Sequence, residues 1–312
     1  MSRDSRLVSV IIPTYDRPEH LKQALDSVLS QGYEPIEVVV VDDCPSHPVK
    51  ETVRSYSSDR IQYIQHSKNK GVCAARNTGI QNASGKYVSF LDDDDRWSSE
   101  KVEKQVQLLE TTDDAGVVYT GARRVDESEN TISVSIPEYN GAIAKEILLN
   151  DFVPFSTILT YSNVIKKSGK LDEKLTNWED WEWCIRLAEQ TEFEVIEEAL
   201  VITDRGSHNQ RSDNFEQKRD VGYGRFVKAV QPIAAQYGTL FKRKWKGHTN
   251  FHLGYAALSN GYYSDARKLF YRAIQYWPFV RKFYMYFSIA LTGKRGYLAT
   301  RSLKRWVVDK IN

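Results

Sequence analysis

The sequence has few cysteines and no long apolar run, and these absences exclude several classes of protein. Cys44, Cys73 and Cys184 are an odd number among 312 residues, and their spacing fits neither a metal motif nor a disulfide framework, so we expect a reducing, cytoplasmic compartment. The longest apolar segments, such as residues 283–291, are too short to span a bilayer. No apolar leader precedes the first apolar run at residue 8, so no signal peptide is expected. The remaining composition, 41% hydrophobic and 27% charged, is typical of a water-soluble globular protein.

Acidic residues are scarce in the C-terminal third of the chain. Residues 205–312 contain 21 Lys and Arg but 5 Asp and Glu, roughly +16, whereas residues 1–204 contain 22 and 36, roughly −14. This asymmetry predicts a polyanionic or membrane-surface partner, and the aromatic residues of the basic part favour peripheral contact with the inner face of a membrane. The alternative is a basic surface that pairs with the acidic part of the chain. Nucleic acid is not expected as a partner, because no recognition motif accompanies the charge.

The basic part has the residue pattern of helices. Small and large residues between His252 and Pro278 follow the spacing of one tetratricopeptide-type helix pair. One such pair cannot form a solenoid, because stacked neighbours are what bury its faces. We therefore predict a main domain at residues 1–210 and a basic, aromatic helical extension at residues 211–312, with the helix pair packed on the main domain.

The first two hundred residues alternate between apolar, β-branched runs and segments with apolar residues at helical spacing. This alternation predicts an α/β fold, with a doubly wound, mostly parallel but mixed sheet and helices on both faces. The predicted strands are residues 8–13, 36–41, 61–64, 86–91, 115–120 and 193–202, and the predicted helices are residues 18–31, 49–56, 71–81 and 101–109. The polar residues 123–139 are expected to form a hairpin or flap.

Polar clusters follow three of the predicted strands. They are residues 13–16, the pair Asp42 and Asp43, and a run of four aspartates at residues 92–95. Because ligands of doubly wound sheets bind beyond the carboxyl ends of strands, these clusters are expected to meet at one edge. Grouped carboxylates are hard oxygen ligands that suit Mg²⁺ or Mn²⁺ together with phosphates. The alternative for the run is a solvated acidic turn, but it follows an apolar strand and precedes a tryptophan.

The order and spacing of these segments resemble glycosyltransferase family 2, the inverting nucleotide-sugar transferases with a GT-A fold. The matching segments are Val8-Ser9-Val10-Ile11-Ile12-Pro13-Thr14-Tyr15, Val40-Val41-Asp42-Asp43, Gly71-Val72-Cys73-Ala74-Ala75-Arg76-Asn77, Phe90-Leu91-Asp92-Asp93-Asp94-Asp95 and Glu179-Asp180. Cys44 departs from the family pattern, which more often has a small residue there. The resemblance implies transfer of a sugar from a nucleotide diphosphate donor, with UDP favoured, to a hydroxyl of a glycan or lipid-linked acceptor in cell-envelope polysaccharide synthesis. It leaves the helical extension unexplained.

The resemblance implies that the loops after the first two strands bind the nucleotide. Asp43 resembles the base-binding group, with Pro13 and Tyr15 nearby, because the N3–H of uracil is a natural donor to a carboxylate. The alternative for Asp43 is a cap at the end of its strand. Arg76 is expected to orient the aspartates or to contact the phosphates through its planar guanidinium. A surface arginine without a role is an equal alternative.

The resemblance assigns different roles within the aspartate run. Asp94 is the expected ligand of Mn²⁺ or Mg²⁺, and Asp92 or Asp93 is expected to contact the ribose or the adjoining hydrogen-bond network. The metal would bridge the diphosphate and neutralise charge on the leaving nucleotide. Asp95 is interpreted either as part of this site or as the start of the next turn. His208 is a candidate third metal ligand, with a solvent-exposed loop histidine as the alternative.

Glu179 and Asp180 resemble the acceptor-side acids of the family. Inverting transfer needs a base opposite the leaving group, which takes the proton of the attacking hydroxyl. Asp180 is the predicted base, and Glu179 is predicted to orient it or the acceptor. Trp178, Trp181 and Trp183 are expected to offer stacking faces to sugars and to desolvate the carboxylate. The alternative is a helix start with capping acids and tryptophans in the core.

Two other functions use similar residues. A nucleotidyltransferase also binds metal and phosphates with acids on an α/β sheet, but residues 13–17 contain no glycine for a phosphate loop. A catalytically silent scaffold would bind peptides through the helical extension, but one helix pair is too small for a repeat groove. Asp16 and Arg17, in the same glycine-free loop, are interpreted as caps of the helix that follows.

Overall fold

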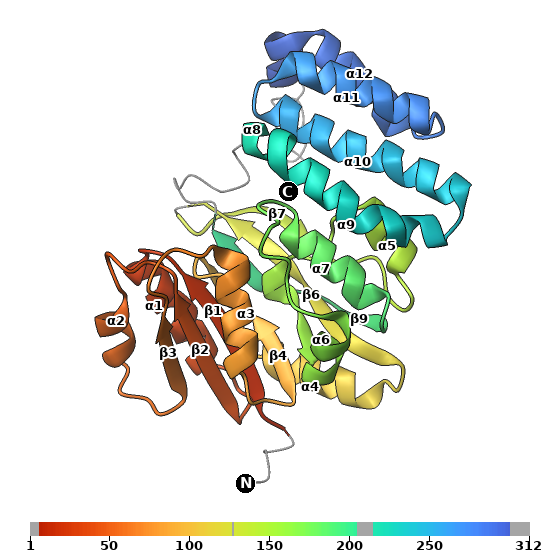
Figure 1. Ribbon diagram of the computed structural model, residues 1–312. Helices are drawn as coiled ribbons and strands as arrows, with labels where there is room; N and C mark the ends of the chain where they lie inside the picture. The colour runs from red at the N-terminus through yellow and green to blue at the C-terminus, as the bar shows by residue number, and fades with distance from the viewer. Residues whose placement is uncertain (1–5, 127, 205–214, 300–312) are drawn as a thin grey trace. The chain divides into compact units, whose positions relative to one another are not determined.

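Nine strands of the described residues form one mixed sheet. The computed structural model describes residues 6–126, 128–204 and 215–299 (Figure 1). The strands are β1 (Val8–Thr14), β2 (Ile36–Asp42), β3 (Ile61–Gln65), β4 (Tyr87–Phe90), β5 (Asp95–Trp97), β6 (Ala115–Val125), β7 (Thr131–Ser135), β8 (Leu159–Tyr161) and β9 (Glu192–Asp204). Their order is β3-β2-β1-β4-β8-β6-β9-β5, and β7 pairs with β6 outside this path.

The sheet has a parallel part and a mixed part. β1 pairs in parallel with β2 and β4, and β2 pairs in parallel with β3. β8 is antiparallel to both β4 and β6, whereas β6 and β9 are parallel. β8 lies between β4 and β6 and joins the two parts of the sheet. Because β8 runs opposite to both neighbours, the sheet as a whole is mixed. The predicted mixed α/β sheet is confirmed.

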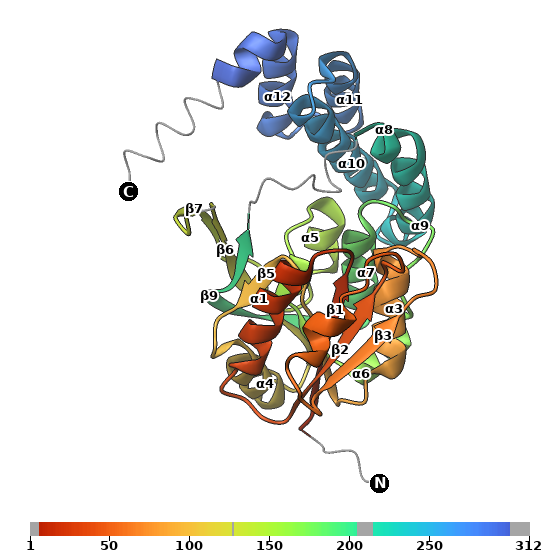
Figure 2. The same ribbon diagram turned by 90° about the vertical axis from the view of Figure 1, so that its left-hand side faces the viewer.

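Helices connect the strands and cover both faces of the sheet. They are α1 (Pro18–Leu29), α2 (Lys50–Arg54), α3 (Val72–Asn82), α4 (Lys101–Thr111), α5 (Ala144–Leu149), the 3-10 helix η1 (Phe155–Thr157), α6 (Ser162–Ser168) and α7 (Glu179–Ala188). Figures 1 and 2 show α1 and α4 on one face, and α3, α6 and α7 on the other.

Burial on both faces explains why β1 is mostly apolar, with Ser9 and Thr14 as its polar residues. All seven of its residues are buried. Val10 and Ile12 belong to one core cluster with Leu21 of α1, whereas Ile11 contacts α3 on the opposite face. A Cβ atom at Gly79 of α3 would lie 2.3 Å from Cγ2 of Ile11. The helix therefore approaches the strand this closely only because residue 79 has no side chain.

The structure extends the predicted set of strands. β6 continues to Val125 and forms the expected hairpin with β7. β5 was not predicted: its first residue is Asp95, which pairs with Thr203 of β9. β8 occupies the end of an apolar segment that begins near residue 153. β5 and β8 are short, and each is held in place by pairing with a strand distant in sequence.

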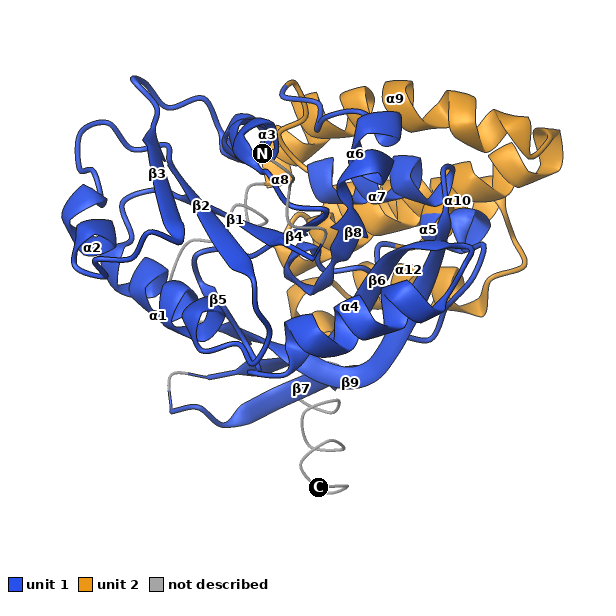
Figure 3. Ribbon diagram, turned by 90° about the horizontal axis from the view of Figure 1, so that it is seen from below, with its two compact units in different colours: residues 1–147, 151–173, 179–208 blue, residues 148–150, 174–178, 209–312 orange. Residues whose placement is uncertain are grey.

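The described chain divides into two compact units (Figure 3). Unit 1 comprises residues 1–147, 151–173 and 179–208, and unit 2 comprises residues 148–150, 174–178 and 209–312. The sheet lies in unit 1. The predicted domain boundary after residue 210 falls outside the described residues. The division of the chain into two domains at that residue therefore stays a prediction.

Unit 2 is helical. Its elements are α8 (Phe215–Gln217), a π-helical turn (Lys218–Gly222), α9 (Tyr223–Gln236), α10 (Thr239–Ser259), α11 (Tyr263–Tyr276) and α12 (Arg281–Leu291). α10 and α11 pack closely because Gly254 of α10 leaves room for the ring of Phe270, which would lie 2.8 Å from a Cβ there. A tetratricopeptide-type arrangement of this pair stays a prediction. Across the described residues, every helix is too short or too polar to cross a membrane.

Candidate active site

Three loops meet at one edge of the sheet in unit 1. Thr14, the last residue of β1, is in register with Asp42, the last residue of β2. The carbonyl of Thr14 accepts a hydrogen bond from the amide of Asp43 at 2.9 Å. β4 pairs with β1 on its other side and delivers the aspartate run to the same edge. Pro13 and Tyr15, the aspartates after β2 and the run after β4 are therefore brought together, as the sequence predicts.

The aspartate run alternates between accessible and buried carboxylates. The side chains of Asp92 and Asp94 are 37% and 31% exposed, whereas that of Asp93 is 9% exposed. Oγ1 of Thr14 donates to Oδ2 of Asp93 at 2.8 Å. Nη1 of Arg17 lies 3.3 Å from Oδ1 of Asp93 and 3.0 Å from Oδ2 of Asp94. Asp92 and Asp94 are thus the carboxylates of this trio that a metal ion from solvent can reach.

Arg17 precedes α1 but its side chain does not cap the helix. No capping hydrogen bond comes from this side chain, which is directed to the aspartate run instead. A guanidinium has donors only, so it cannot accept from the free amides at a helix start, whereas it can donate to two carboxylates. Arg17 therefore occupies the N-cap position of α1 through its backbone, whose carbonyl accepts from the amide of Leu21 at 3.0 Å, whereas its side chain does not cap the helix. No local pattern indicates this ion pair, because its partners lie far along the chain.

The run carries more negative charge than its arginines compensate. Desolvation, assisted by repulsion from Asp94 and Asp92, raises the pKa of Asp93 to about 6 against the opposing effects of Thr14 and Arg17. Desolvation and neighbouring carboxylates also raise the pKa of Asp94, and raise that of the next aspartate well above its ordinary value. A divalent cation would relieve this repulsion, so the donor set fits Mg²⁺ or Mn²⁺ in charge and in ligand type.

Asp95 joins the run to η1. Oγ of Ser156 donates to Oδ2 of Asp95 at 2.6 Å and accepts from the amide of Asp92 at 3.1 Å. The amide of Asp95 in turn donates to the carbonyl of Asp92 at 3.0 Å. Asp95 therefore fixes the shape of the turn and begins β5, which is the second of the two roles that the sequence left open. Nothing in the sequence marks Ser156 as its partner.

Arg76 lies on α3 and is buried, so the interpretation as a surface arginine is wrong. Its Nη2 lies 2.6 Å from Oδ1 of Asp92, and its guanidinium lies 4.1 Å from the ring centre of Phe155. Its Nε has no hydrogen-bond partner among the described residues. Burial alone would lower the pKa of Arg76, but attraction by Asp92 and by the two acids that begin α7 raises it. The guanidinium couples the aspartate run electrostatically to the two acids that begin α7.

Asp42 is held by uncharged donors. Its Oδ1 accepts from the amide of Cys44 at 3.0 Å. Its Oδ2 accepts from the amide of Val49 at 2.8 Å and from the hydroxyl of Tyr63 at 2.7 Å. One carboxylate thus fixes both ends of the loop between β2 and α2. Asp42 is the structural member of the pair.

Asp43 fixes the start of α3. Its Oδ1 accepts from the amide of Lys70 at 2.8 Å and lies 2.8 Å from Nδ1 of His66, and its Oδ2 accepts from the amide of Gly71 at 2.7 Å. Nε2 of His66 lies 2.9 Å from Oγ1 of Thr78 on α3. His66 was not predicted, since a single histidine after β3 has no distinguishing pattern. Oδ2 of Asp43 keeps the capacity to accept one further donor.

Glu179 and Asp180 are the first two residues of α7. Oδ1 of Asp180 accepts from the amide of Trp181 at 2.8 Å, a contact at the start of the helix where backbone amides lack partners. Trp178, directly before them, has φ of +61°. This left-handed conformation is rare for an aromatic residue and costs on the order of 1–3 kcal/mol. Strained backbone of this kind clusters at functional sites.

Trp181 and Trp183 lie in the core rather than at a sugar-binding surface. Both are almost fully buried, and their indole N–H groups donate to the carbonyls of Ile147 and Gly169 at 2.6 and 3.0 Å. The prediction that these two tryptophans stack on sugars is wrong. They are two residues apart and lie on different sides of α7, where Trp183 packs on Phe90 and Phe155 and Trp181 bonds to α5, and both sides are covered. His208, the candidate third metal ligand, lies outside the described residues.

The sequence profile of the family described as glycosyl transferase family 2 matches residues 9–165. An uncharacterized glycosyltransferase of Methanocaldococcus jannaschii is 30% identical over 204 residues, which are 64% of this chain and 70% of that protein. One from Rickettsia prowazekii is 32% identical over 203 residues, 63% of each chain. A putative teichuronic acid biosynthesis glycosyltransferase, TuaG of Bacillus subtilis, is 36% identical over 105 residues, 33% of this chain and 42% of TuaG. The chain belongs to glycosyl transferase family 2.

Solved structures share the fold. S. aureus TarS residues 1–349 in complex with UDP-GlcNAc superposes with a TM-score of 0.66 at 20% identity, covering 86% of this chain and 81% of that one. The mannosyltransferase PcManGT from Pyrobaculum calidifontis, in complex with GDP-Man and Mn²⁺, gives a TM-score of 0.56 at 16% identity, covering 96% and 86%. The predicted GT-A fold class, with a helical C-terminal region, is confirmed.

Proposed function

We propose that this chain is an inverting, metal-dependent glycosyltransferase that moves a sugar from a nucleotide diphosphate sugar to a hydroxyl of a glycan or lipid-linked acceptor. UDP is the favoured nucleotide, because Asp43 has an accepting oxygen suited to the N3–H of uracil and because TarS binds UDP-GlcNAc. The observation that carries the proposal is Arg76, a buried guanidinium attracted both by Asp92 of the run and by the acids of α7. Family membership favours this reading over nucleotidyl transfer and over a silent scaffold.

The proposed metal ligand is Asp94, with Asp92 in support. Both carboxylates are accessible, and both offer hard oxygen atoms. Bound Mn²⁺ or Mg²⁺ would neutralise charge on the diphosphate of the donor. Arg17 and Arg76 hold the carboxylates in place, and Asp93 supports them through its bond to the hydroxyl of Thr14. His208 stays the proposed third ligand.

The proposed base is Asp180, and Glu179 is proposed to orient it or the acceptor. Asp180 uses Oδ1 to accept from a backbone amide, and the second oxygen is proposed to accept the proton of the attacking hydroxyl. Removing that proton as the sugar–phosphate bond breaks makes the oxygen a better nucleophile and inverts the anomeric carbon in one displacement. Pro13 and the exposed ring of Tyr15 are proposed as the walls of the base subsite.

Asp180→Asn removes the proposed base with little change in shape. We expect turnover to fall about 10²- to 10⁴-fold, the usual contribution of general base catalysis, while Mn²⁺-dependent UDP binding is retained. Steady-state kinetics and calorimetric titration with UDP measure the two quantities. Asp113→Asn, at an exposed carboxylate between α4 and β6, is the matched control and should leave both unchanged. Near-normal turnover of Asp180→Asn would show that the base is another residue.

A nucleotide-sugar screen tests the proposal as a whole. Thermal stability and donor hydrolysis are measured with UDP-, GDP- and dTDP-sugars, each with Mn²⁺ and with a chelator. We expect stabilisation and slow hydrolysis with a UDP-sugar and Mn²⁺, and neither in chelator. Absence of stabilisation by every donor contradicts the proposed activity, and equal stabilisation in chelator contradicts the metal dependence.

Unit 2 is proposed to rest on an anionic membrane surface where a lipid-linked acceptor would lie. Residues 266–299 contain no acidic residue, and Phe279, Met285 and Leu291 are exposed around α12. Apolar side chains beside basic ones are the pattern of interfacial helices. Flotation with phosphatidylglycerol vesicles at low salt should carry the protein, and Phe279→Ser should weaken this. Failure to float, or equal flotation with neutral phosphatidylcholine vesicles, contradicts the hypothesis.

A further inference from the structure

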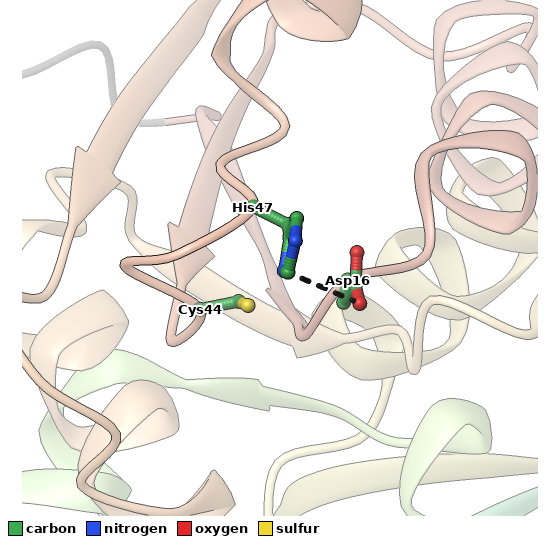
Figure 4. A group of neighbouring side chains, drawn as sticks. All are labelled: Asp16, Cys44 and His47. Carbon is green, nitrogen blue, oxygen red and sulfur yellow. Dashed lines mark ion pairs between the residues drawn. The ribbon is translucent and has the colours of Figure 1, made fainter.

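Three side chains with different donor atoms face one another beside the first two strand ends. Asp16 follows β1, and Cys44 and His47 follow β2 (Figure 4). Their sulfur, nitrogen and oxygen atoms all lie within 4.8 Å of one another. Nδ1 of His47 lies 3.8 Å from Oδ2 of Asp16, and Sγ of Cys44 lies 3.5 Å from Oγ of Ser46. The aspartate run does not include any of these residues.

The loop that carries Cys44 and His47 is fixed before any ligand binds. The carboxylate of Asp42 accepts from the amides of Cys44 and Val49 and so closes the loop at both ends. Pro45 and Pro48 flank its middle and restrict the backbone further. A site held in this way loses little conformational freedom when it binds.

Asp16 is directed toward this loop by its backbone. It has φ of +54°, in the left-handed region that aspartate tolerates better than most residues. Its carboxylate faces His47 rather than the start of α1. The interpretation of Asp16 as a helix cap is therefore replaced by a contact between the two loops.

We propose that Asp16, Cys44 and His47 bind a borderline-soft divalent cation of the zinc class. Thiolate, imidazole and carboxylate together are a typical zinc donor set, whereas Mn²⁺ and Mg²⁺ prefer oxygen alone. Zinc bonds of about 2.0–2.3 Å in a tetrahedron place ligand atoms ~3.5 Å apart, so the observed group needs to contract by about one ångström, within reach of side-chain rotation. Binding releases the thiol proton of Cys44 to solvent, because the thiolate is the ligand.

The proposed ion joins the loop after β1 to the loop after β2. Three protein ligands leave a fourth position for water. Asp16 adjoins Tyr15 and Cys44 adjoins Asp43, so the ion also fixes the walls of the base subsite. This last consequence rests on the proposed function, whereas the binding of the ion does not.

Cobalt titration of the full chain tests the site. The protein is freed of metal with a chelator, kept reduced with a phosphine, and titrated with Co²⁺, whose thiolate complexes absorb in the near ultraviolet. We expect one equivalent to give this absorption, Zn²⁺ to displace it, and Cys44→Ser to abolish it. His47→Gln and Asp16→Asn should each weaken binding at least tenfold. A wild-type protein without the absorption, or Cys44→Ser that keeps it, overturns the proposal.

Matched variants separate this site from the other cysteines and from the aspartate run. Cys73→Ser should keep the cobalt absorption. Loss of the absorption in this variant would mean that Cys73 binds the ion, which would overturn the assignment. If Cys44→Ser fails to fold by circular dichroism, Asp16→Asn decides, because its side chain is exposed. Asp94→Asn should keep the cobalt absorption, because the aspartate run supplies none of the three proposed ligands. If neither the wild type nor any variant binds UDP, the proposed function fails. A cobalt absorption that depends on Cys44 would still support the metal site in that case.

Discussion

Asp42 at the end of β2 and the aspartates after β4 have similar sequence contexts but opposite environments. Asp42 is bound by two backbone amides and a tyrosine hydroxyl, all of which are uncharged. Asp92 and Asp94 are instead paired with guanidinium groups and remain accessible. The first environment uses the carboxylate as a connector of loops. The second keeps carboxylate oxygens available to a cation.

The difference teaches what distinguishes a structural carboxylate from a binding one. Asp42 has a donor for each oxygen, so a metal would have to displace bonds that the fold needs. In the run after β4, desolvation and the crowding of negative charge raise the pKa values of Asp93 and Asp94. Crowding of this kind is a cost to the apoprotein that a bound cation removes. The neighbours, rather than the aspartate itself, decide which role applies.

Asp94→Asn should have the largest effect on function. Loss of the charge at the proposed metal ligand should lower transfer about 10³-fold, as for other losses of electrostatic stabilisation, and should weaken Mn²⁺-dependent UDP binding. The free energy of unfolding should stay the same or rise, because one repelling carboxylate is removed. Kinetics with a UDP-sugar and urea denaturation measure these effects. Unchanged metal dependence would move the ligand role to another aspartate of the run.

Asp42→Asn is the matched change on the other side of the comparison. An asparagine can accept with one oxygen only, so at least one of the three donors at Asp42 loses its acceptor in a buried site. The free energy of unfolding should fall by about 3 kcal/mol, the scale of lost hydrogen bonds to a charged group. Turnover per folded molecule should change little. A functional loss as large as that of Asp94→Asn, with unchanged stability, would reverse the two roles.

The parallel part of the fold could be predicted because its strands are buried on both faces. A run such as residues 8–13 is apolar at every position but Ser9, and the end of each strand places its polar residues at a known edge. β5 could not be predicted, since Asp95 and Arg96 leave it with one apolar residue in three. Its pairing with β9 is a tertiary contact that no local pattern contains.

The site could be predicted as a set of residues but not as a network. Family motifs identified Asp43, Arg76 and the aspartate run, and all of these lie in unit 1. The ion pairs of Arg17 could not be foreseen, because they join residues on separate loops. Trp181 and Trp183 show the opposite error. Their nearness to Glu179 suggested sugar stacking, but both are buried because neighbouring elements cover α7 on two sides.

Arg76→Met sharpens the comparison by removing one guanidinium while keeping much of its apolar volume. The carboxylate of Asp92 then loses its partner, and the free energy of unfolding should fall by about 2–3 kcal/mol, somewhat less than for a fully buried pair because Asp92 is partly exposed. Urea denaturation measures the change. Added Mn²⁺ with UDP should restore part of the loss, because a cation replaces the missing charge. Arg54→Met, at an exposed pair on α2, is the control and should change stability little.

The smallest expected effect is the pH dependence that Asp93 contributes to stability. Its pKa is about 6 in the fold because of desolvation, above the ordinary aspartate value, so the folded state binds this proton more tightly than the unfolded state does. Its contribution to the free energy of unfolding is therefore greatest below about pH 4 and declines by about 2 kcal/mol as the pH rises through 6. Asp93→Asn removes this decline, so the stability of the variant relative to wild type should increase between pH 4 and 6.5. Urea denaturation at each pH measures the difference in free energy of unfolding between the two proteins. The contributions of all other carboxylates are common to both proteins and cancel in this difference. If the free energies of unfolding of the two proteins change in parallel with pH, Arg17 and Thr14 keep Asp93 ionised. Asp93 would then be a carboxylate stabilised by its donors, as Asp42 is.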